Sequence, residues 1–215
     1  MMIRKSSWLA ILLSMCFVFA GYHVTLAQVN LLQNADFEDP TDAPWTMWIE
    51  GAAAGAAATK GVDNSDSITG NQSLLIEISA EGGDKRVELH QNPFTLKNGQ
   101  KLIYAFWAKT EAGKTRDARM ISNERAAPWT SYGSQDITIT DRWTEYWIPV
   151  EMTADSERVG IYVELRDTPA PARVWFDHFR FYVGDYVEEN LVDTTTSVEP
   201  ASKLAVTWSS IKAKL

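Results

Sequence analysis

Short segments in which hydrophobic and polar residues alternate recur along most of the chain. Hydrophobic residues occupy every second position in residues 73–78, 86–91 and 158–165. A period of two places successive side chains on opposite faces of an extended strand. Turn signals such as Asn98-Gly99 separate these segments. The pattern predicts roughly ten short strands and an all-β fold, an antiparallel β-sandwich.

The remaining strands are expected over residues 29–32, 45–50, 101–110, 118–123, 137–139, 143–150 and 174–183. The run Gly51–Ala58 consists of Gly and Ala alone, and we interpret it as a small-residue strand or a loop. Trp129 and Tyr132 are expected in a loop that precedes residue 137.

The last of these segments, residues 174–183, contains an unexpected carboxylate. Regular alternation places Trp175, Asp177, Phe179, Phe181 and Val183 on one face, which is apolar except for Asp177. A buried carboxylate must be protonated, hydrogen-bonded or paired with a cation. We therefore expect Asp177 to have a specific partner.

The N-terminus is typical of an exported protein. Arg4 and Lys5 precede an apolar run over residues 8–20, and a small-residue cleavage site lies before Gln28. The run is short for a transmembrane helix, although an uncleaved anchor is an alternative. We interpret residues 1–27 as a signal peptide and expect a secreted or cell-surface protein.

Charge and cysteine content narrow the possible partners. The net charge is −8 and becomes −10 when residues 1–27 are removed, because Arg4 and Lys5 leave with them. Such acidity argues against nucleic acid, whose binding depends on basic residues, and suits a neutral partner or a divalent cation. The one cysteine, Cys16, lies in the signal segment, so disulfides are not expected in the mature chain.

The C-terminal region differs in composition from the rest. Residues 188–201 are acidic and contain no aromatic residue, which is typical of a linker. In residues 202–215 the apolar side chains fall at helical spacing, as Leu204, Trp208, Ile211 and Leu215 do. This tail is either a terminal helix that packs on the domain or a docking tag. The folded module is thus expected over residues 28–187.

No catalytic motif is visible. His90 and His178 lack the spacing of metal ligands, and no nucleophile elbow or phosphate loop is present. A pair of carboxylates for glycoside hydrolysis remains open, and Glu164 is the acid that we would consider.

An ordered set of motifs resembles a known family. The chain contains Asn30-Leu31-Leu32-Gln33-Asn34-Ala35-Asp36-Phe37-Glu38, then Gly70-Asn71-Gln72-Ser73-Leu74, Tyr104–Lys109, Trp143-Thr144 and Phe176-Asp177. In this order they resemble the carbohydrate-binding modules of the cellulose- and xylan-binding group, families four, nine, sixteen and twenty-two. The resemblance covers residues 29–183 and implies a jelly-roll sandwich related to galactose-binding-like domains.

The resemblance also implies a structural calcium ion that joins the first and last strands. The family's acidic metal-binding positions match Glu38 and Asp177, and the carbonyls of Asp36 and Asn71 are plausible further ligands. Calcium favours such oxygen ligands. The alternative is that Asp177 caps a turn while Glu38 is solvated.

A sugar site is implied on the concave sheet of the sandwich. Sugars bind to aromatic platforms with a few polar groups around them. Alternation and the expected loop supply these candidates: Trp107, Lys109, Arg119, Asn123, Trp129, Tyr132, Tyr162, Glu164 and Arg166. For Trp107 a place in the core is an equally good interpretation.

Together these features predict a secreted, non-catalytic protein that binds a polysaccharide or oligosaccharide. Its further partner would be a glycoside hydrolase acting in trans, or a surface bound through the C-terminal tail. The alternatives are an extracellular structural or adhesion domain and a small jelly-roll hydrolase or lyase. The xylan-binding members carry an aromatic residue near the position of residues 81–86, where this chain has none. The sequence therefore does not predict which polysaccharide is bound.

Overall fold

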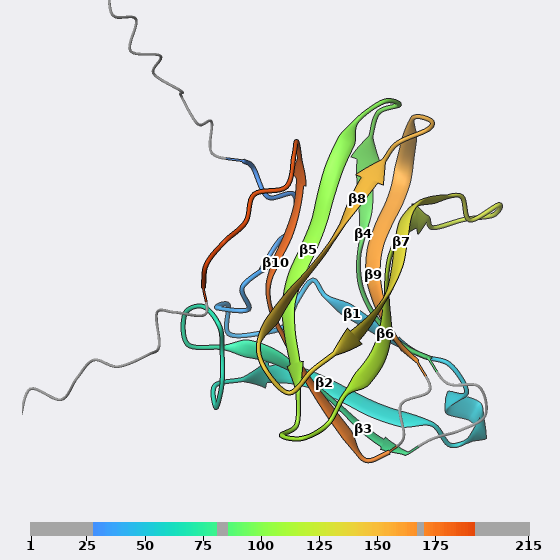
Figure 1. Ribbon diagram of the computed structural model, residues 1–215. Coiled ribbons are helices and arrows are strands. Elements are labelled where there is room, and N and C mark those ends of the chain that lie inside the picture. The colour runs from blue at the N-terminus through green and yellow to red at the C-terminus, as the bar shows by residue number, and fades with distance from the viewer. Residues whose placement is uncertain (1–27, 81–85, 167–169, 192–215) are drawn as a thin grey trace, which may run out of the picture.

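The computed structural model describes residues 28–80, 86–166 and 170–191 (Figure 1). Within this part of the chain the structure has ten strands and one short 3-10 helix. No helix there is long and apolar enough to cross a membrane. The elements are β1 (Thr46–Ile49), the 3-10 helix (Ala52–Ala54), β2 (Ala57–Asp63), β3 (Ser73–Ala80), β4 (Arg86–Leu96), β5 (Lys101–Thr110), β6 (Arg116–Glu124), β7 (Ser131–Ile139), β8 (Thr144–Glu151), β9 (Ser156–Arg166) and β10 (Ala172–Val183).

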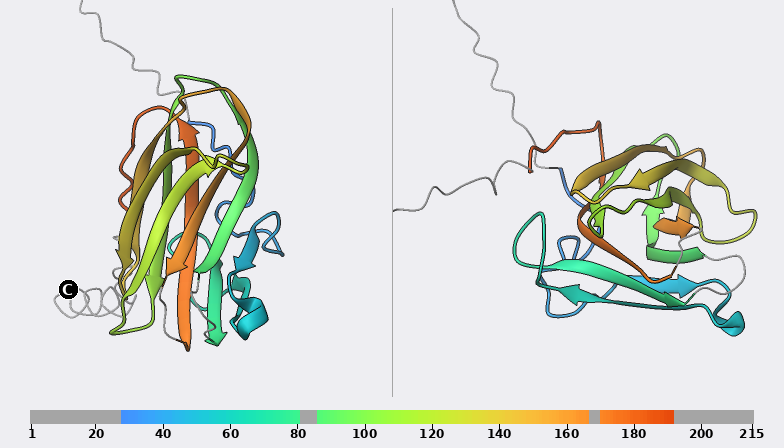
Figure 2. Two further views of the ribbon diagram at one scale, coloured as in Figure 1. Left: turned by 90° about the vertical axis from the view of Figure 1, so that its right-hand side faces the viewer. Right: turned by 60° about the horizontal axis from the view of Figure 1, so that its bottom comes forward.

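The strands form two five-stranded sheets, in which every pair of neighbours is antiparallel. Sheet A has the order β1-β4-β9-β6-β7, and sheet B has the order β2-β3-β10-β5-β8. Figure 2 shows the two layers packed against each other. The predicted antiparallel β-sandwich is confirmed.

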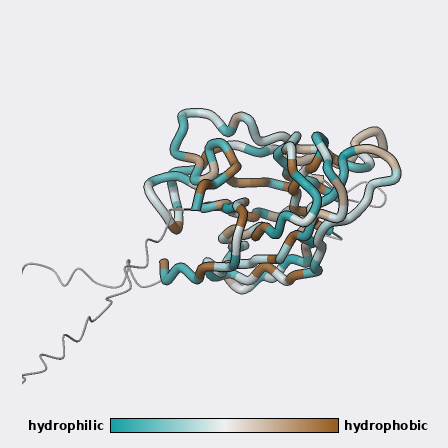
Figure 3. The backbone as a smooth tube through the Cα atoms, turned by 90° about the horizontal axis from the view of Figure 1, so that it is seen from above, coloured by the Kyte–Doolittle hydropathy of each residue, from teal (hydrophilic) through white to brown (hydrophobic). Residues whose placement is uncertain are grey.

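The core lies between the sheets and follows the alternation of the sequence. On β5 the side chains of Leu102, Tyr104, Phe106 and Ala108 face inward and are fully buried, as their alternation predicts. Figure 3 shows hydrophobic and hydrophilic residues interspersed along the backbone of the sandwich. Each strand thus buries one row of side chains and leaves the opposite row on an outer face.

Strand β10 departs from regular alternation. A β-bulge between Asp177 and Arg180 shifts its register against β5, and His178 adopts the left-handed φ of 49°. Phe176 and Phe179 therefore both belong to the core, while Asp177 pairs across the strands with Trp107, on the outer row of β5. The expectation that Trp175 and Asp177 share a face with Phe179 is wrong, because the bulge inserts an extra residue.

The segment before β1 is not a strand, although a strand was expected over residues 29–32. It is tied to β10 by two backbone hydrogen bonds, from Leu31 N–H to Phe181 O (2.8 Å) and from Phe179 N–H to Ala35 O (2.8 Å). Trp45 packs against Phe179 with 4.4 Å between the ring centroids and an angle of 46° between the ring planes. The chain therefore enters the sandwich alongside its closing strand.

Most of the Gly51–Ala58 run is a turn that contains a short 3-10 helix, and only Ala57 and Ala58 belong to a strand. Its 3-10 helix lies between Gly51 (φ 76°) and Gly55 (φ 96°), and β2 begins at Ala57. The left-handed φ of both glycines explains why small residues without a Cβ border this turn.

Several expectations fall outside the described residues: the signal peptide over residues 1–27, most of the linker and the tail over residues 202–215. Residues 188–191, the first part of the expected linker, are described and lie next to β10 (Figure 1).

A close approach of β7 to β8 gives a test of this packing. A Cβ added at Gly133 would lie 2.5 Å from the backbone oxygen of Pro149 and 3.3 Å from Val150 Cγ2. We expect Gly133→Ala to lower the free energy of unfolding by about 1–3 kcal/mol, because backbone atoms cannot yield. Chemical denaturation measures this change.

The matched control is Gly61→Ala on β2, where an added Cβ has nothing within 4 Å. This variant should be neutral or stabilising by roughly 0.5–1 kcal/mol, since Ala loses less backbone entropy on folding. Equal behaviour of the two variants would contradict the close contact between β7 and β8.

Candidate functional site

A cleft of about 620 Å³ lies on the outer face of sheet A. Strand register brings its floor together, because Glu88 pairs with Glu164 and His90 pairs with Tyr162 across β4 and β9. Further lining residues come from the edge strand β1, from β6 and from the loop after β6. The full set is Trp48, Arg86, Glu88, His90, Asn123, Arg125, Trp129, Tyr162 and Glu164.

Two exposed tryptophans border the cleft. Trp48 on β1 is 45% exposed, and Trp129 in the loop after β6 is 56% exposed. Trp129 has the left-handed φ of 61°, which is an outlier for a bulky side chain. Its N–H closes a turn on Ala126 O at 2.8 Å. Backbone strain of this kind concentrates at ligand-binding positions.

Glu164 is held between two arginines. Arg86 Nη1 donates to its Oε1 at 3.0 Å, and Arg166 Nε donates to its Oε2 at 2.7 Å. Arg86 also forms a bidentate pair with Glu50, at 2.6 and 3.1 Å. The guanidinium of Arg86 lies 5.7 Å from the ring centroid of Trp48, so these ion pairs position the first tryptophan.

Glu88 is the second carboxylate of the floor. Burial raises its pKa, while Arg125, which donates to Glu88 Oε1 at 2.8 Å, opposes that shift. The Arg125 guanidinium also lies 4.7 Å from the Tyr162 ring centroid. Burial, together with the negative charges of Glu88 and Glu164, raises the pKa of Tyr162 to about 12. Burial lowers the pKa of His90, which favours its neutral form.

Asn123 has a hydrogen-bonding group that no described residue uses. Its side chain is buried, and within the part of the chain described here Oδ1 has no hydrogen-bond donor. Because unpaired buried oxygens are rare in native proteins, this amide is suited to accept a hydrogen bond from a ligand.

The structure brings together several of the residues expected at a sugar site. Asn123, Trp129, Tyr162 and Glu164 line the cleft. Arg119 pairs in register with Glu164 and forms an ion pair with Asp136 at 3.1 Å. Arg166 lines an adjoining depression of about 390 Å³ with Asp117, Ala118, Asp136, Ile137 and Thr138. Arg119 and Arg166 thus lie beside the cleft, on the same outer face of sheet A.

Three expected residues lie elsewhere. Tyr132 is on β7 and belongs to the core, where its hydroxyl donates to Glu124. Trp107 and Lys109 are on β5, in sheet B, so the expectation that they share a sheet with Glu164 is wrong. The cause is strand order, since β5 lies between β10 and β8.

Lys109 has a structural role on that other face. Its ammonium forms an ion pair with Asp66 and lies 5.2 Å from the Trp175 ring centroid and 5.7 Å from that of Trp143. The indole N–H of Trp143 also donates to Asp66, at 2.9 Å.

The residues that sequence reasoning missed are Trp48, Arg86, Glu88, His90 and Arg125. The sequence did indicate the face of three of them. Val87 and Leu89 alternate with Arg86, Glu88 and His90, which places these three polar side chains together on the outer face of their strand. The neighbouring position of β4 and β9, which makes this row part of the cleft, is not visible in the sequence.

The expected metal ligands converge on one turn. Glu38 Oε1 accepts the N–H groups of Asn71 (2.7 Å) and Gln72 (2.8 Å). Asp177 Oδ2 accepts those of Ile68 (2.9 Å) and Thr69 (3.0 Å). The two carboxylates therefore hold the 68–72 turn, which joins β2 to β3, against the N-terminal segment and β10.

Asp177 is fully buried. Burial raises its pKa to about 6, although the N–H groups of Thr69, Ile68 and His178 oppose the shift. Among the described residues no group of three or more His, Cys, Asp or Glu could hold a metal ion. Both hydrogen bonds that the Glu38 carboxylate accepts from the turn go to Oε1, and no hydrogen bond to Glu38 Oε2 is found among the described residues.

The fold is similar to that of several solved carbohydrate-binding structures. A structure described as "CBM4 structure and function" shares 19% identity and a TM-score of 0.55, over 71% of this chain and 99% of that one. The CBM22-1 xylan-binding domain of Paenibacillus barcinonensis Xyn10C shares 19% identity and a TM-score of 0.55, over 74% and 97%. TmCBM61 in complex with β-1,4-galactotriose shares 15% identity and a TM-score of 0.51, over 73% and 100%.

No curated protein sequence matches the chain. A family model described as "Carbohydrate binding domain" matches residues 29–171, which is more than half of the chain and includes most of both sheets. The chain belongs to this family of carbohydrate-binding domains.

Proposed function

We propose that the protein is secreted and non-catalytic, and that it binds a neutral polysaccharide in the cleft of sheet A. The observation that carries the proposal is the pair of half-exposed tryptophans, Trp48 and Trp129, on either side of a buried polar floor. Indole rings offer the apolar platform on which a pyranose face stacks.

The span of the cleft favours a chain of sugars over a single sugar. Trp48 lies on β1 and Trp129 lies in the loop after β6, and the order β1-β4-β9-β6 places three strand spacings between these two strands. Three strand spacings correspond to roughly 14 Å. An oligosaccharide segment can bridge that width, with Asn123 Oδ1 accepting a hydrogen bond from a hydroxyl group.

The charges of the cleft favour a neutral ligand. Arg86 is paired with Glu50 and Glu164, and Arg125 is paired with Glu88. Because each of these guanidiniums already has a carboxylate, no arginine among these pairs is available for a uronate. The acidity of the chain also disfavours a polyanion.

The first test is affinity electrophoresis in gels that contain neutral glucans, xylans or galactans, with pectin as the anionic comparison. We expect retention in at least one neutral gel. Trp129→Ala and Trp48→Ala should each weaken binding by more than about tenfold, as expected for aromatic anchors. The control is Val183→Ala on β10, which trims an apolar side chain of similar exposure, 49%, and lines neither the cleft nor the pocket beside Trp147.

Trp129 allows a second, sharper variant. Trp129→Gly relieves the left-handed backbone strain, so it should keep or raise the free energy of unfolding, by up to about 1 kcal/mol, while it weakens retention. If Trp129→Gly and Trp48→Ala are both retained as strongly as the wild type, the cleft is not the polysaccharide-binding site.

We also propose that a calcium ion binds beside the 68–72 turn. Glu38 and Asp177 would anchor it, with carbonyl oxygens of Asp36 and Asn71 as further ligands. The support is the oxygen chemistry of this set and the convergence of both carboxylates on one turn. The ion would add a charge-based link to the hydrogen bonds between that turn, the N-terminal segment and β10.

The calcium proposal predicts that a chelator lowers the melting temperature and that added calcium restores it. Glu38→Gln keeps an acceptor oxygen for the N–H groups of Asn71 and Gln72 but removes the charge, so it should abolish the chelator-sensitive part of the stability. If the wild-type protein melts at the same temperature with and without chelator, the calcium proposal is contradicted. The turn would then be held by hydrogen bonds alone.

The alternative function for the same cleft is glycoside hydrolysis. The observation that favours it is the register pair Glu88 and Glu164, in which burial raises the pKa of Glu88 beside a carboxylate held by two arginines. Pairs of carboxyl groups with different environments serve as acid and nucleophile in glycosidases. Release of reducing ends that is lost in Glu88→Gln, while retention persists, would favour this function over binding alone.

A further inference from the structure

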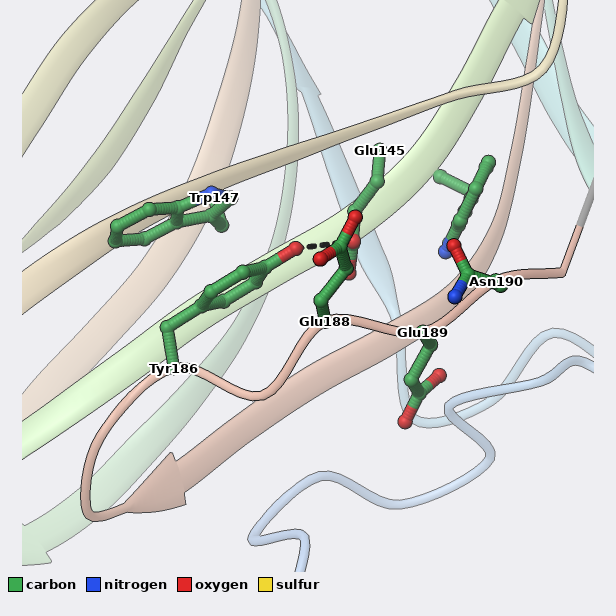
Figure 4. A pocket seen from close by; sticks show the side chains of 7 residues that line it. Glu145, Trp147, Tyr186, Glu188, Glu189 and Asn190 are labelled. Atoms are coloured by element: carbon green, nitrogen blue, oxygen red, sulfur yellow. Dashed lines mark hydrogen bonds between the residues drawn. The ribbon is translucent and has the colours of Figure 1, made fainter.

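A second pocket, drawn in Figure 4, lies on the outer face of sheet B. The cleft lies on the outer face of sheet A, so the two are on opposite sides of the sandwich. Its volume is about 380 Å³, within the range of small-molecule sites. It is enclosed by β5, β8 and the segment after β10. The lining residues are Trp107, Glu145, Trp147, Tyr186, Glu188, Glu189 and Asn190.

The segment after β10 turns back over the sheet and forms one wall (Figure 4). Arg180 holds it in place, because Nη1 donates to Val187 O at 2.9 Å and pairs with Glu189 Oε1 at 2.9 Å. Val187 N–H donates to the Tyr182 hydroxyl at 3.2 Å. The beginning of the expected linker is thus part of a built site.

The second wall is aromatic. Trp147 stacks on Tyr186, with ring centroids 4.2 Å apart and an interplanar angle of 11°. The Tyr186 hydroxyl donates to Glu145 Oε2 at 2.7 Å (Figure 4), which fixes the ring. Trp147 remains 41% exposed, so this stack offers a rigid apolar surface to a ligand.

Trp107 contributes a donor without an acceptor. Its side chain is 4% exposed, and its Nε1–H has no hydrogen-bond partner among the described residues. A buried N–H of this kind is costly unless a partner is supplied. A ligand that brings a hydroxyl or ring oxygen to Trp107 would supply it.

The pocket carries more negative than positive charge. Glu145 is paired with Arg180, and Glu189 contacts both Arg180 and His178 Nε2, the latter at 2.5 Å. No hydrogen bond or ion pair links Glu188 to any described residue, and its side chain is exposed. Three carboxylates thus face one guanidinium and one imidazole, which favours a cationic ligand.

We propose that this pocket binds a cationic amino sugar, a hexosamine with a free ammonium group. Its pyranose face lies on Trp147, a hydroxyl oxygen accepts from Trp107 Nε1, and the ammonium pairs with Glu188. The Asn190 amide is available for a further hydroxyl. A lysine side chain fits less well, because an ammonium on an alkyl chain offers no acceptor to Trp107.

The test is isothermal titration of the chain with a glucosamine trisaccharide at physiological salt. The N-acetylated trisaccharide, which is neutral, should bind about tenfold or more weakly, and Glu188→Gln should cause a comparable loss with the charged ligand. The matched control is Asp185→Asn, which removes the same charge from an exposed residue that does not line the pocket. Equal weakening by both variants would reduce the effect to general electrostatics and overturn the proposal.

Two further variants separate this pocket from the cleft. Trp107→Phe removes the unpaired N–H, so it should weaken the amino sugar without lowering the melting temperature, whereas Trp129→Ala should leave this ligand unaffected. Loss of binding in Trp129→Ala but not in Trp107→Phe would place the ligand in the cleft.

Equal affinity for the N-acetylated trisaccharide or for a trilysine peptide would also overturn the proposal. Because neutral polysaccharide retention is measured separately, failure here leaves the function of the cleft intact.

Discussion

The bulge in β10 is the constraint on which the core and the outer face of sheet B depend. β10 is the middle strand of sheet B, so a change of register there affects its neighbours on both sides. The bulge allows Phe176 and Phe179 to enter the core on either side of Asp177 and His178. A regular strand would turn one of these phenylalanines outward or bury the Asp177 carboxylate among aromatic rings, and each result is costly.

The same bulge explains how two polar side chains on β10 come to organise loops. Asp177 accepts the N–H groups of Ile68 and Thr69 and thereby fixes the turn between β2 and β3. Arg180 binds Glu145 and the segment after β10. One irregularity in the strand therefore positions both the turn beside which calcium is proposed and the wall of the second pocket. Bulges commonly redirect side chains in this way.

The sequence predicted the fold and the faces of regular strands, and it failed where regularity ended. On β5, β6 and β9 the alternation assigned the inward and outward rows correctly, because these strands pair along their length. On β10 the adjacent polar residues Asp177 and His178 were the available sign of a bulge, and alternation alone placed Asp177 on the wrong face.

The cleft could be predicted only in part, for a different reason. Alternation gives the face of a residue within its strand, but it does not say which strands are neighbours. Tyr162 and Glu164 were therefore identified while Glu88, their neighbour on β4, was not. Trp107 and Lys109 were assigned to the wrong sheet for the same reason, since nothing in their own segment reveals that β5 lies between β10 and β8.

The two outer faces of the sandwich differ in how their charges are satisfied, and this difference bears on what each can bind. In the cleft Glu88 and Glu164 each have an arginine partner, so the polar groups of the proposed site would orient a ligand without attracting a charge. In the second pocket Arg180 pairs with two carboxylates and Glu188 has no partner within the described chain.

The packed core, about 10 Å thick, separates the two sites and prevents one sugar ring from reaching both. A polysaccharide that carries neutral and aminated segments could contact both faces only by passing around an edge of the sandwich. Two sites of this kind would gain avidity on an extended matrix rather than on a short oligosaccharide.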